Sequence, residues 1–164
     1  MSNSDTFRAY RITDSDGKVS ARFVDLRIED LTPGDVVVRV SHSTINYKDA
    51  LAATGAAPIL RRYPLNGGID LAGEVVSSED AELEAGTPVL VNGCGLGESV
   101  DGGYAEYARV DSSSIVPIPD GMSTAEAMSI GTAGYTAALA IHRMEQNGQL
   151  PENMTVTAYR SEIL

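Results

Sequence analysis

The stretch GMSTAEAMSIGTAGYTAALAIHRMEQNG, residues 121–148, decides the fold, because the chain changes there from strand patterns to helix patterns. Ser123 precedes Glu126 by three residues, a spacing in which the two side chains can satisfy backbone donors at a helix start. From Thr132 onward, apolar residues recur at helical intervals as far as Gly148, and glycine is favoured just beyond a helix end. The sequence therefore predicts one helix after Ser123 and a second helix that begins at Thr132.

The residues before this stretch follow strand patterns. Two alternating runs, 7–12 and 19–26, flank Asp16-Gly17, a dipeptide typical of hairpin turns. After Pro151, the β-branched residues 155–157 predict a late strand. Many strands, then helices, then a single strand indicate an all-β domain that passes into the first unit of an α/β domain. The other predicted elements are strands over 35–45, 69–76, 87–92 and 103–117, and a short helix over 46–54.

Composition and charge narrow the possible partners. The chain has 164 residues, of which 43% are hydrophobic, and its formal net charge is −11. These values fit a folded globular protein, and the lack of a basic cluster argues against a nucleic-acid partner. Cys94 is the only cysteine, which excludes an internal disulfide and suits a reducing cytoplasm. No run approaches the ~18 apolar residues of a membrane span, so we expect no membrane partner.

Several common catalytic motifs are absent from the sequence. The two histidines, His42 and His142, form no zinc-hydrolase motif, and neither a G-x-S-x-G elbow nor a G-x-x-x-x-G-K-[ST] loop occurs. These absences argue against a zinc hydrolase, a Ser-His-Asp triad and ATP or GTP chemistry. We interpret His42 as a strand histidine bonded to a neighbour, and His142 as a solvated residue of the long helix.

Four other stretches combine polar side chains with glycines. They are INYKDALAATG (45–55), YPLNGGIDLAGEVV (63–76), NGCGLGESVDGGYAEYARV (92–110) and GTAGYTA (131–137). In order and spacing they resemble the medium-chain dehydrogenase/reductase superfamily. Within its zinc-independent, quinone-oxidoreductase-like branch, the chain is similar to the acrylyl-CoA reductase (YhdH/YhfP-type) family from residue 7 to residue 157.

The resemblance implies two parts of different fold. Residues 1–130 are expected to form a mainly β, GroES-like catalytic domain. Residues 131–164 are expected to form a connecting helix and the first strand of a Rossmann domain. In such enzymes that domain binds NADPH through a Gly-rich phosphate loop, but TAYRSEIL (157–164) stands in its place here. We therefore expect a chain that ends early in its Rossmann domain, by truncation, frameshift or excision, and that is inactive alone.

The implied function is NADPH-dependent, zinc-independent reduction of an activated C=C bond, with acrylyl-CoA converted to propionyl-CoA. Two alternatives stay open. One is an NADPH quinone oxidoreductase, and the other is a non-catalytic GroES-like binding or assembly module, since co-chaperonins use the same barrel. The expected partner is a small acyl-CoA or quinone substrate, and the resemblance implies a homodimer for the family.

The resemblance also predicts that no metal is bound. Zinc-dependent relatives hold their metal with a Cys and a His-Glu pair, where this chain has Asn46 and Ile69-Asp70. An amide and an isoleucine are not competent zinc ligands.

Tyr47 and Asn46 are the candidate catalytic residues. Tyr47 would polarise the substrate or relay a proton, because a phenol with a pKa of about 10 keeps its proton at neutral pH. Alternatively, it packs the start of the short helix. Asn46 would orient cofactor or substrate through its amide, and an N-cap role is equally open. Thr132 is expected near the nicotinamide, where its hydroxyl would contact the cofactor, cap the helix or do both.

Charged residues near these positions have supporting roles. Arg61 and Arg62 are candidate substrate contacts, because acyl-CoA and NADPH are polyanions and the chain is acidic. Asp49 is expected to form a structural hydrogen bond, a catalytic one, or a local ion pair with Lys48. Asp70 is expected to be structural and to fix the Gly-rich turn through backbone N–H groups.

Overall fold

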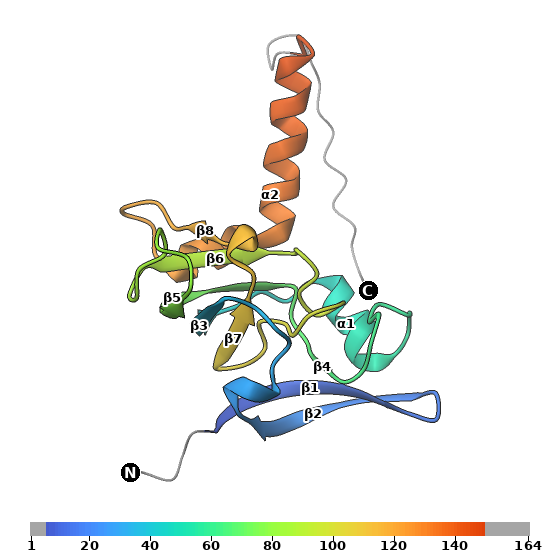
Figure 1. The fold of residues 1–164 in the computed structure, drawn as a ribbon. Helices are drawn as coiled ribbons and strands as arrows, with labels where there is room; N and C mark the ends of the chain where they lie inside the picture. The colour runs from blue at the N-terminus through green and yellow to red at the C-terminus, as the bar shows by residue number, and fades with distance from the viewer. Residues whose placement is uncertain (1–5, 150–164) are drawn as a thin grey trace.

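The computed structural model describes residues 6–149, and most of its elements are strands (Figure 1). This confirms the mainly β fold and the short helix after residue 46. In chain order the elements are β1 (Phe7–Ser15), β2 (Lys18–Leu26), the 3₁₀ turn η1 (Ile28–Asp30), β3 (Val36–His42), α1 (Tyr47–Thr54), β4 (Leu65–Asn66), β5 (Asp70–Ser78), β6 (Pro88–Asn92), β7 (Tyr107–Val110), the 3₁₀ turn η2 (Ser112–Ser114), β8 (Val116–Pro117) and α2 (Thr124–Gln146).

The strands form two antiparallel sheets. The smaller sheet has the order β2-β1-β4, and the larger one has the order β7-β3-β5-β6-β8. A bridge pairs Ala9 of β1 with Ala105, and Tyr10 N donates to Tyr104 O at 2.7 Å. In Figure 1 the β1–β2 hairpin runs beneath the larger sheet. The bridge therefore joins the two sheets into one barrel-like unit.

The main hydrophobic core is built from alternate residues of the larger sheet. Val36 and Val38 of β3, and Val89 and Val91 of β6, are fully buried and pack with Leu71. Successive side chains of a strand point to opposite faces, so only every second residue of these apolar runs enters the core. Each such burial stabilises the fold by about 1.5–3 kcal/mol, and the pattern thereby specifies the strand register.

The prediction of a single strand over 103–117 is wrong. The turn η2 separates β7 from β8. Asp111 Oδ1 accepts a hydrogen bond from Ser113 N at 3.0 Å, and Asp35 Oδ1 accepts one from Ser112 N at 2.7 Å. Side chains of Asp compete with the sheet for backbone donors in this way, and the strand is interrupted as a result.

The helix α2 begins as predicted and contains a break. Ser123 is its N-cap: Ser123 Oγ accepts from Glu126 N at 3.2 Å, and Ser123 N donates to Glu126 Oε2 at 2.8 Å. Gly131 has φ 52° and ψ −165°, which are not helical, so a second helical segment starts at Thr132 as expected. This segment projects away from the sheets in Figure 1, and its Ile141 is 56% exposed.

The predicted strand at 155–157 and the TAYRSEIL segment lie outside the described residues. The division of the chain at residue 130 stays a prediction, although the break at Gly131 coincides with it. None of the helices within residues 6–149 combines the length and the apolar character needed to cross a bilayer.

Candidate functional site

Asn46 is the N-cap of α1, at the position that the sequence predicts. Its side chain, however, does not cap the helix. Asn46 Nδ2 donates instead to Thr44 Oγ1 at 2.7 Å and to Asp70 Oδ2 at 3.0 Å. The barrel therefore holds the amide group of Asn46, and the helix does not.

Asp49 is a buried link between α1 and the turn before β5. Its Oδ2 accepts from Asn46 N at 2.8 Å, and its Oδ1 accepts from Ile69 N at 3.0 Å. The alternative ion pair with Lys48 is wrong, because Lys48 Nζ pairs with Glu98. Both carboxylate oxygens of Asp49 are engaged with backbone, which favours its structural role over a catalytic one.

Four side chains from three other segments surround the carboxylate of Asp70. The residue is fully buried. Thr44 Oγ1 and Asn46 Nδ2 donate to Oδ2 at 2.6 and 3.0 Å, and Asn92 Nδ2 donates to Oδ1 at 2.9 Å. Thr132 contributes two bonds, from its hydroxyl to Oδ1 and from its N–H to Oδ2 at 3.1 Å. We call Thr44, Asn46, Asp70, Asn92 and Thr132 the Asp70 cluster.

The prediction that Asp70 fixes the Gly-rich turn through backbone amides is wrong. Asp49 takes the amide of Ile69, and Asp70 is left to bind side chains and the amide of Thr132. Burial alone would raise the pKa of Asp70, but the hydrogen bonds, led by those from Asn92 and Thr132, outweigh burial and hold the pKa below its ordinary value. Asp70 is therefore an anion at neutral pH.

The break at Gly131 lets Thr132 reach Asp70. A Cβ atom at Gly131 would lie 2.7 Å from Thr44 Cγ2, closer than real Cβ contacts allow. The φ of 52° also belongs to the left-handed region that favours glycine. Gly131, where α2 meets the barrel, must thus be glycine for two reasons: Thr44 leaves no room for a Cβ atom, and the backbone conformation is left-handed.

The Thr132 hydroxyl does not cap the helix, which was one of its predicted roles. Its proton goes to Asp70, and the carboxylate of Asp70, not a side chain of α2, accepts the backbone amide at this helix start. Anionic groups are favoured at helix N-termini because the first amides there have no partner within the helix. Asp70 therefore caps the start of the second segment of α2 and orients this segment.

Tyr47 and Ile45 flank Asn46 on the outer surface. Tyr47 is 73% exposed and Ile45 is 90% exposed, whereas Asn46 and Thr132 are half-buried. The exposure of Tyr47 argues against the alternative in which it packs the helix start. The structure thus brings together Asn46, Thr132 and Asp70, and it leaves the ring of Tyr47 open to solvent.

Three residues near the site were not found by sequence reasoning: Thr44, Asn92 and Tyr104. Tyr104 OH donates to Thr44 O at 2.8 Å. Burial, with the negative charge of Asp49, raises the pKa of Tyr104 well above its ordinary value, so this phenol remains a donor. No local pattern marks Asn92, because only the antiparallel pairing of β5 with β6 makes it the direct partner of Asp70.

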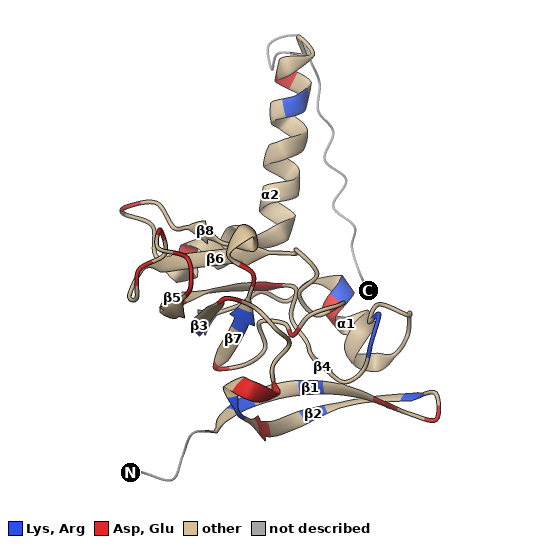
Figure 2. Ribbon diagram, in the orientation of Figure 1, with Lys and Arg blue, Asp and Glu red and all other residues tan. Residues whose placement is uncertain are grey.

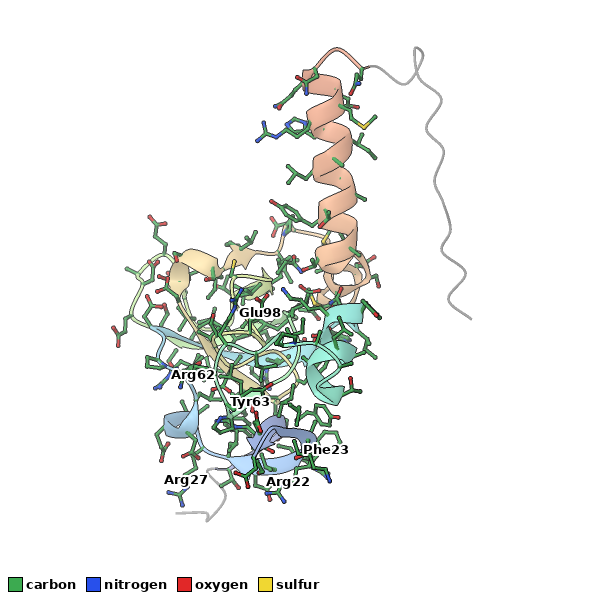
Figure 3. The ribbon with its side chains drawn as sticks, turned by 90° about the vertical axis from the view of Figure 1, so that its right-hand side faces the viewer. Arg22, Phe23, Arg27, Arg62, Tyr63 and Glu98 are labelled. Atoms are coloured by element: carbon green, nitrogen blue, oxygen red, sulfur yellow. The ribbon has the colours of Figure 1, made fainter. Side chains whose placement is uncertain are left out.

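Arg61 and Arg62 are exposed residues of the loop after α1. Arg61 N donates to Glu98 O at 2.7 Å. Among the described residues, no hydrogen bond or salt bridge connects either guanidinium with the Asp70 cluster. In Figure 3 Arg62 and Glu98 lie on the body of the molecule, well below the projecting part of α2, and the ribbon in Figure 2 shows Lys and Arg only at scattered positions. Their role in substrate binding stays a prediction.

Two surface hollows are lined by residues outside the Asp70 cluster. One hollow of about 630 Å³ is lined by Tyr10, Phe23 and Tyr104, among others. Another of about 740 Å³ lies beside Arg27 and Arg39.

The two histidines are placed as expected. His42 Nδ1 lies 2.9 Å from Thr124 Oγ1 and 3.3 Å from Ser41 Oγ, so it is a strand histidine bonded to neighbours. His142 is exposed on α2. Within residues 6–149 no three His, Cys, Asp or Glu side chains gather in a way that could hold a metal ion.

Comparisons with known proteins identify relatives of this arrangement. Residues 32–120 match the family described as "Alcohol dehydrogenase GroES-like domain". The chain is 45% identical over 153 residues to "Putative quinone oxidoreductase YhfP" of Bacillus subtilis, covering 93% of this chain and 46% of that protein. It is 42% identical over 135 residues to "Acrylyl-CoA reductase AcuI" of Ruegeria pomeroyi, covering 82% of this chain and 41% of that protein.

A solved structure gives the same result for the fold. The yhdH oxidoreductase of Salmonella enterica, in complex with NADP, superimposes with a TM-score of 0.86 at 46% identity. The superposition covers 88% of this chain and 45% of that structure. The chain thus spans less than half the length of the relatives that it matches.

Proposed function

The chain belongs to the alcohol dehydrogenase GroES-like domain family of the medium-chain dehydrogenase/reductase superfamily, and from this premise we propose that it forms the catalytic barrel of an NADPH-dependent, zinc-independent reductase of activated C=C bonds. The observation that carries the proposal is the Asp70 cluster, which joins Asn46 at the start of α1 to Thr132 in α2. Hydride transfer requires cofactor and acceptor in a fixed geometry, and rigidly held polar groups supply such positioning.

The residues of this face fit the nicotinamide end of the cofactor. NADPH would supply the hydride when bound. Asn46 and Thr132 are half-buried and fixed by Asp70, so they can orient a planar polar group without a further loss of side-chain freedom. For the phosphate groups, Arg61 and Arg62 are exposed cations of an otherwise acidic chain.

Acrylyl-CoA is the acceptor that we favour. Hydride adds to its β-carbon, the electron pair of the C=C bond moves toward the thioester oxygen, and the resulting enolate takes a proton at its α-carbon. Tyr47 can stabilise the enolate oxygen by donating a hydrogen bond, because it follows Asn46 directly in the chain and its ring is exposed. The similarity to the Ruegeria pomeroyi enzyme supports this substrate class.

A quinone is the second candidate acceptor. The printed name of the Bacillus subtilis relative supports it, and so do the exposed apolar surfaces of Ile45 and Tyr47, against which a flat ring could stack. Reduction of a quinone to the hydroquinone also takes up one hydride and one proton, so the same face would serve.

A chimera tests the proposal directly. Residues 1–149 of this chain would replace the matching half of the Bacillus subtilis relative, and NADPH oxidation would be measured with acrylyl-CoA and with a benzoquinone. The unaltered relative is the control. We expect acrylyl-CoA to be reduced, with kcat/KM higher than that for the quinone. A correctly folded chimera that oxidises NADPH with neither acceptor would refute the function.

A further inference from the structure

We propose that Asp70 determines the hydrogen-bond polarity of the site, so that Asn46 and Thr132 face a ligand as acceptors only. The inference rests on the proposed function for the identity of the ligand. Its physical basis is the set of hydrogen bonds in the Asp70 cluster, that is, which atom donates each proton and which atom accepts it. An ionised carboxylate accepts hydrogen bonds and donates none. Every polar side chain around Asp70 must therefore turn a proton toward it.

The amide of Asn46 has no proton left for a ligand. Its Nδ2 carries two protons, and the two acceptors within reach are Thr44 Oγ1 at 2.7 Å and Asp70 Oδ2 at 3.0 Å. The opposite orientation of the amide would place its carbonyl oxygen against the carboxylate of Asp70, which is repulsive. Only Oδ1 of Asn46 is thus available to a ligand, and it is an acceptor.

Thr132 likewise has no hydrogen-bond donor left for a ligand. Its hydroxyl has one proton, which goes to Asp70 Oδ1, and its backbone N–H goes to Asp70 Oδ2 at 3.1 Å. The hydroxyl oxygen keeps its lone pairs, so it can accept a hydrogen bond from a ligand. Neither donor of Thr132 can stabilise an oxyanion while Asp70 is ionised.

The polarity selects the chemical class of the group that binds. Two acceptors fixed by a buried anion favour a group that presents N–H donors, such as a primary carboxamide, and they disfavour a carboxylate or an enolate oxygen. Stabilisation of the enolate consequently falls to a donor outside the cluster, and the exposed hydroxyl of Tyr47 is the nearest such group in sequence. Asp70 is a positioning residue in this scheme, because it acts through Asn46 and Thr132.

The first test measures the hydrogen bonds of the Asp70 cluster without any ligand. In the ¹⁵N-labelled 164-residue chain, the side-chain NH₂ of Asn46 should exchange with solvent at least about tenfold more slowly than that of the exposed Gln149, because bonds to charged acceptors are worth more than ~1.4 kcal/mol. Equal exchange rates in the folded protein would overturn the proposal.

The second test measures the polarity with matched probes. Nicotinamide and nicotinate have the same size, but the first presents an amide and the second a carboxylate. We expect nicotinamide to shift the NMR signals of Asn46 and Thr132 at concentrations about tenfold lower than nicotinate does. Thr132→Ser should keep this preference, and the nearly isosteric Thr132→Val should reduce it. Asp70→Asn, which gives the cluster a donor, should abolish it.

Each outcome of these measurements decides the matter. If nicotinate shifts the signals as readily as nicotinamide, or if nicotinamide leaves them unchanged, the assignment of polarity is wrong. Should Asp70→Asn fail to fold, the comparison of Thr132→Val with Thr132→Ser still tests the acceptor. An inactive chimera together with preserved discrimination would instead refute the reductase and leave the role of Asp70 intact.

Discussion

Asp70 and Asn92 are direct partners in the pairing of β5 with β6, and Asn92 Nδ2 lies 2.9 Å from Asp70 Oδ1. The sheet thus places the buried carboxylate and its first side-chain donor opposite each other before the helices contribute anything. Loops and helix ends then add the remaining donors. The rigidity of the site therefore originates in the strand register.

Removal of the Asn92 amide should destabilise the fold. Asn92→Ala deletes one hydrogen bond to the buried carboxylate, and bonds to charged groups contribute about 1.5–3 kcal/mol. We expect the free energy of unfolding in urea to fall by that amount. Asn147→Ala, which removes an exposed bond to Arg143 O, is the control and should cost less. Equal costs would contradict a special role for the buried bond.

The stability of the protein should depend on Asp70 in acid. The folded-state pKa of Asp70 is lowered below its unfolded value of about 3.9, so its stabilisation is complete above that value and is lost as pH falls through the folded pKa. We expect the urea midpoint of the wild type to fall more steeply below about pH 4 than that of Asp70→Asn. The lowered pKa of Asp35 persists in both proteins and cancels in the comparison. Parallel curves would show that Asp70 does not titrate as described.

Substitution of Gly131 should disrupt the junction between α2 and the barrel. In Gly131→Ala the left-handed conformation costs about 1–3 kcal/mol, and the new Cβ would also meet Thr44 Cγ2 at 2.7 Å. Gly121→Ala is a matched control, because Gly121 has φ +85° with nothing within 4 Å of the Cβ position. Thermal unfolding should show a larger loss for Gly131→Ala. Similar losses would mean that the contact with Thr44 is unimportant.

The protein should bind no stoichiometric zinc. Asp70 already accepts five hydrogen bonds, and the nitrogen of the Asn46 side chain is not a metal ligand. Elemental analysis after growth in zinc-supplemented medium is therefore expected to find well under one equivalent. One tightly held equivalent that survives dialysis against a chelator would contradict the prediction.

Tyr47 should be needed for turnover in the chimera. Tyr47→Phe removes the exposed hydroxyl that we assign to the enolate oxygen and is expected to lower kcat on acrylyl-CoA by about 10²–10³-fold, as the loss of one oxyanion donor does. The KM for NADPH should change little. Tyr135→Phe, which alters another exposed phenol on α2, provides the control. Unchanged turnover in Tyr47→Phe would show that the Tyr47 hydroxyl does not stabilise the enolate.

Local patterns were sufficient for most of the fold. The hairpin at Asp16-Gly17, the helix start at Ser123 and the break before Thr132 each depend on residues within a few positions of one another, and the structure has all three. The strand predicted over 103–117 failed because Asp35, distant in the sequence, binds the backbone at Ser112. A local sequence pattern cannot show that a residue so distant in the chain will accept this backbone hydrogen bond.

The candidate site was likewise predicted in part from the sequence and decided in part by the tertiary structure. Residue types alone identified Asn46, Asp70 and Thr132 as candidates, since amides, carboxylates and hydroxyls at element boundaries commonly bind something. Their partners, and hence the direction in which each proton points, follow from distances between segments that only folding brings together. A hydrogen bond is directional and short-ranged, so the order of residues along the chain cannot specify it until the sheet register and the turn at Gly131 have set the positions of the atoms.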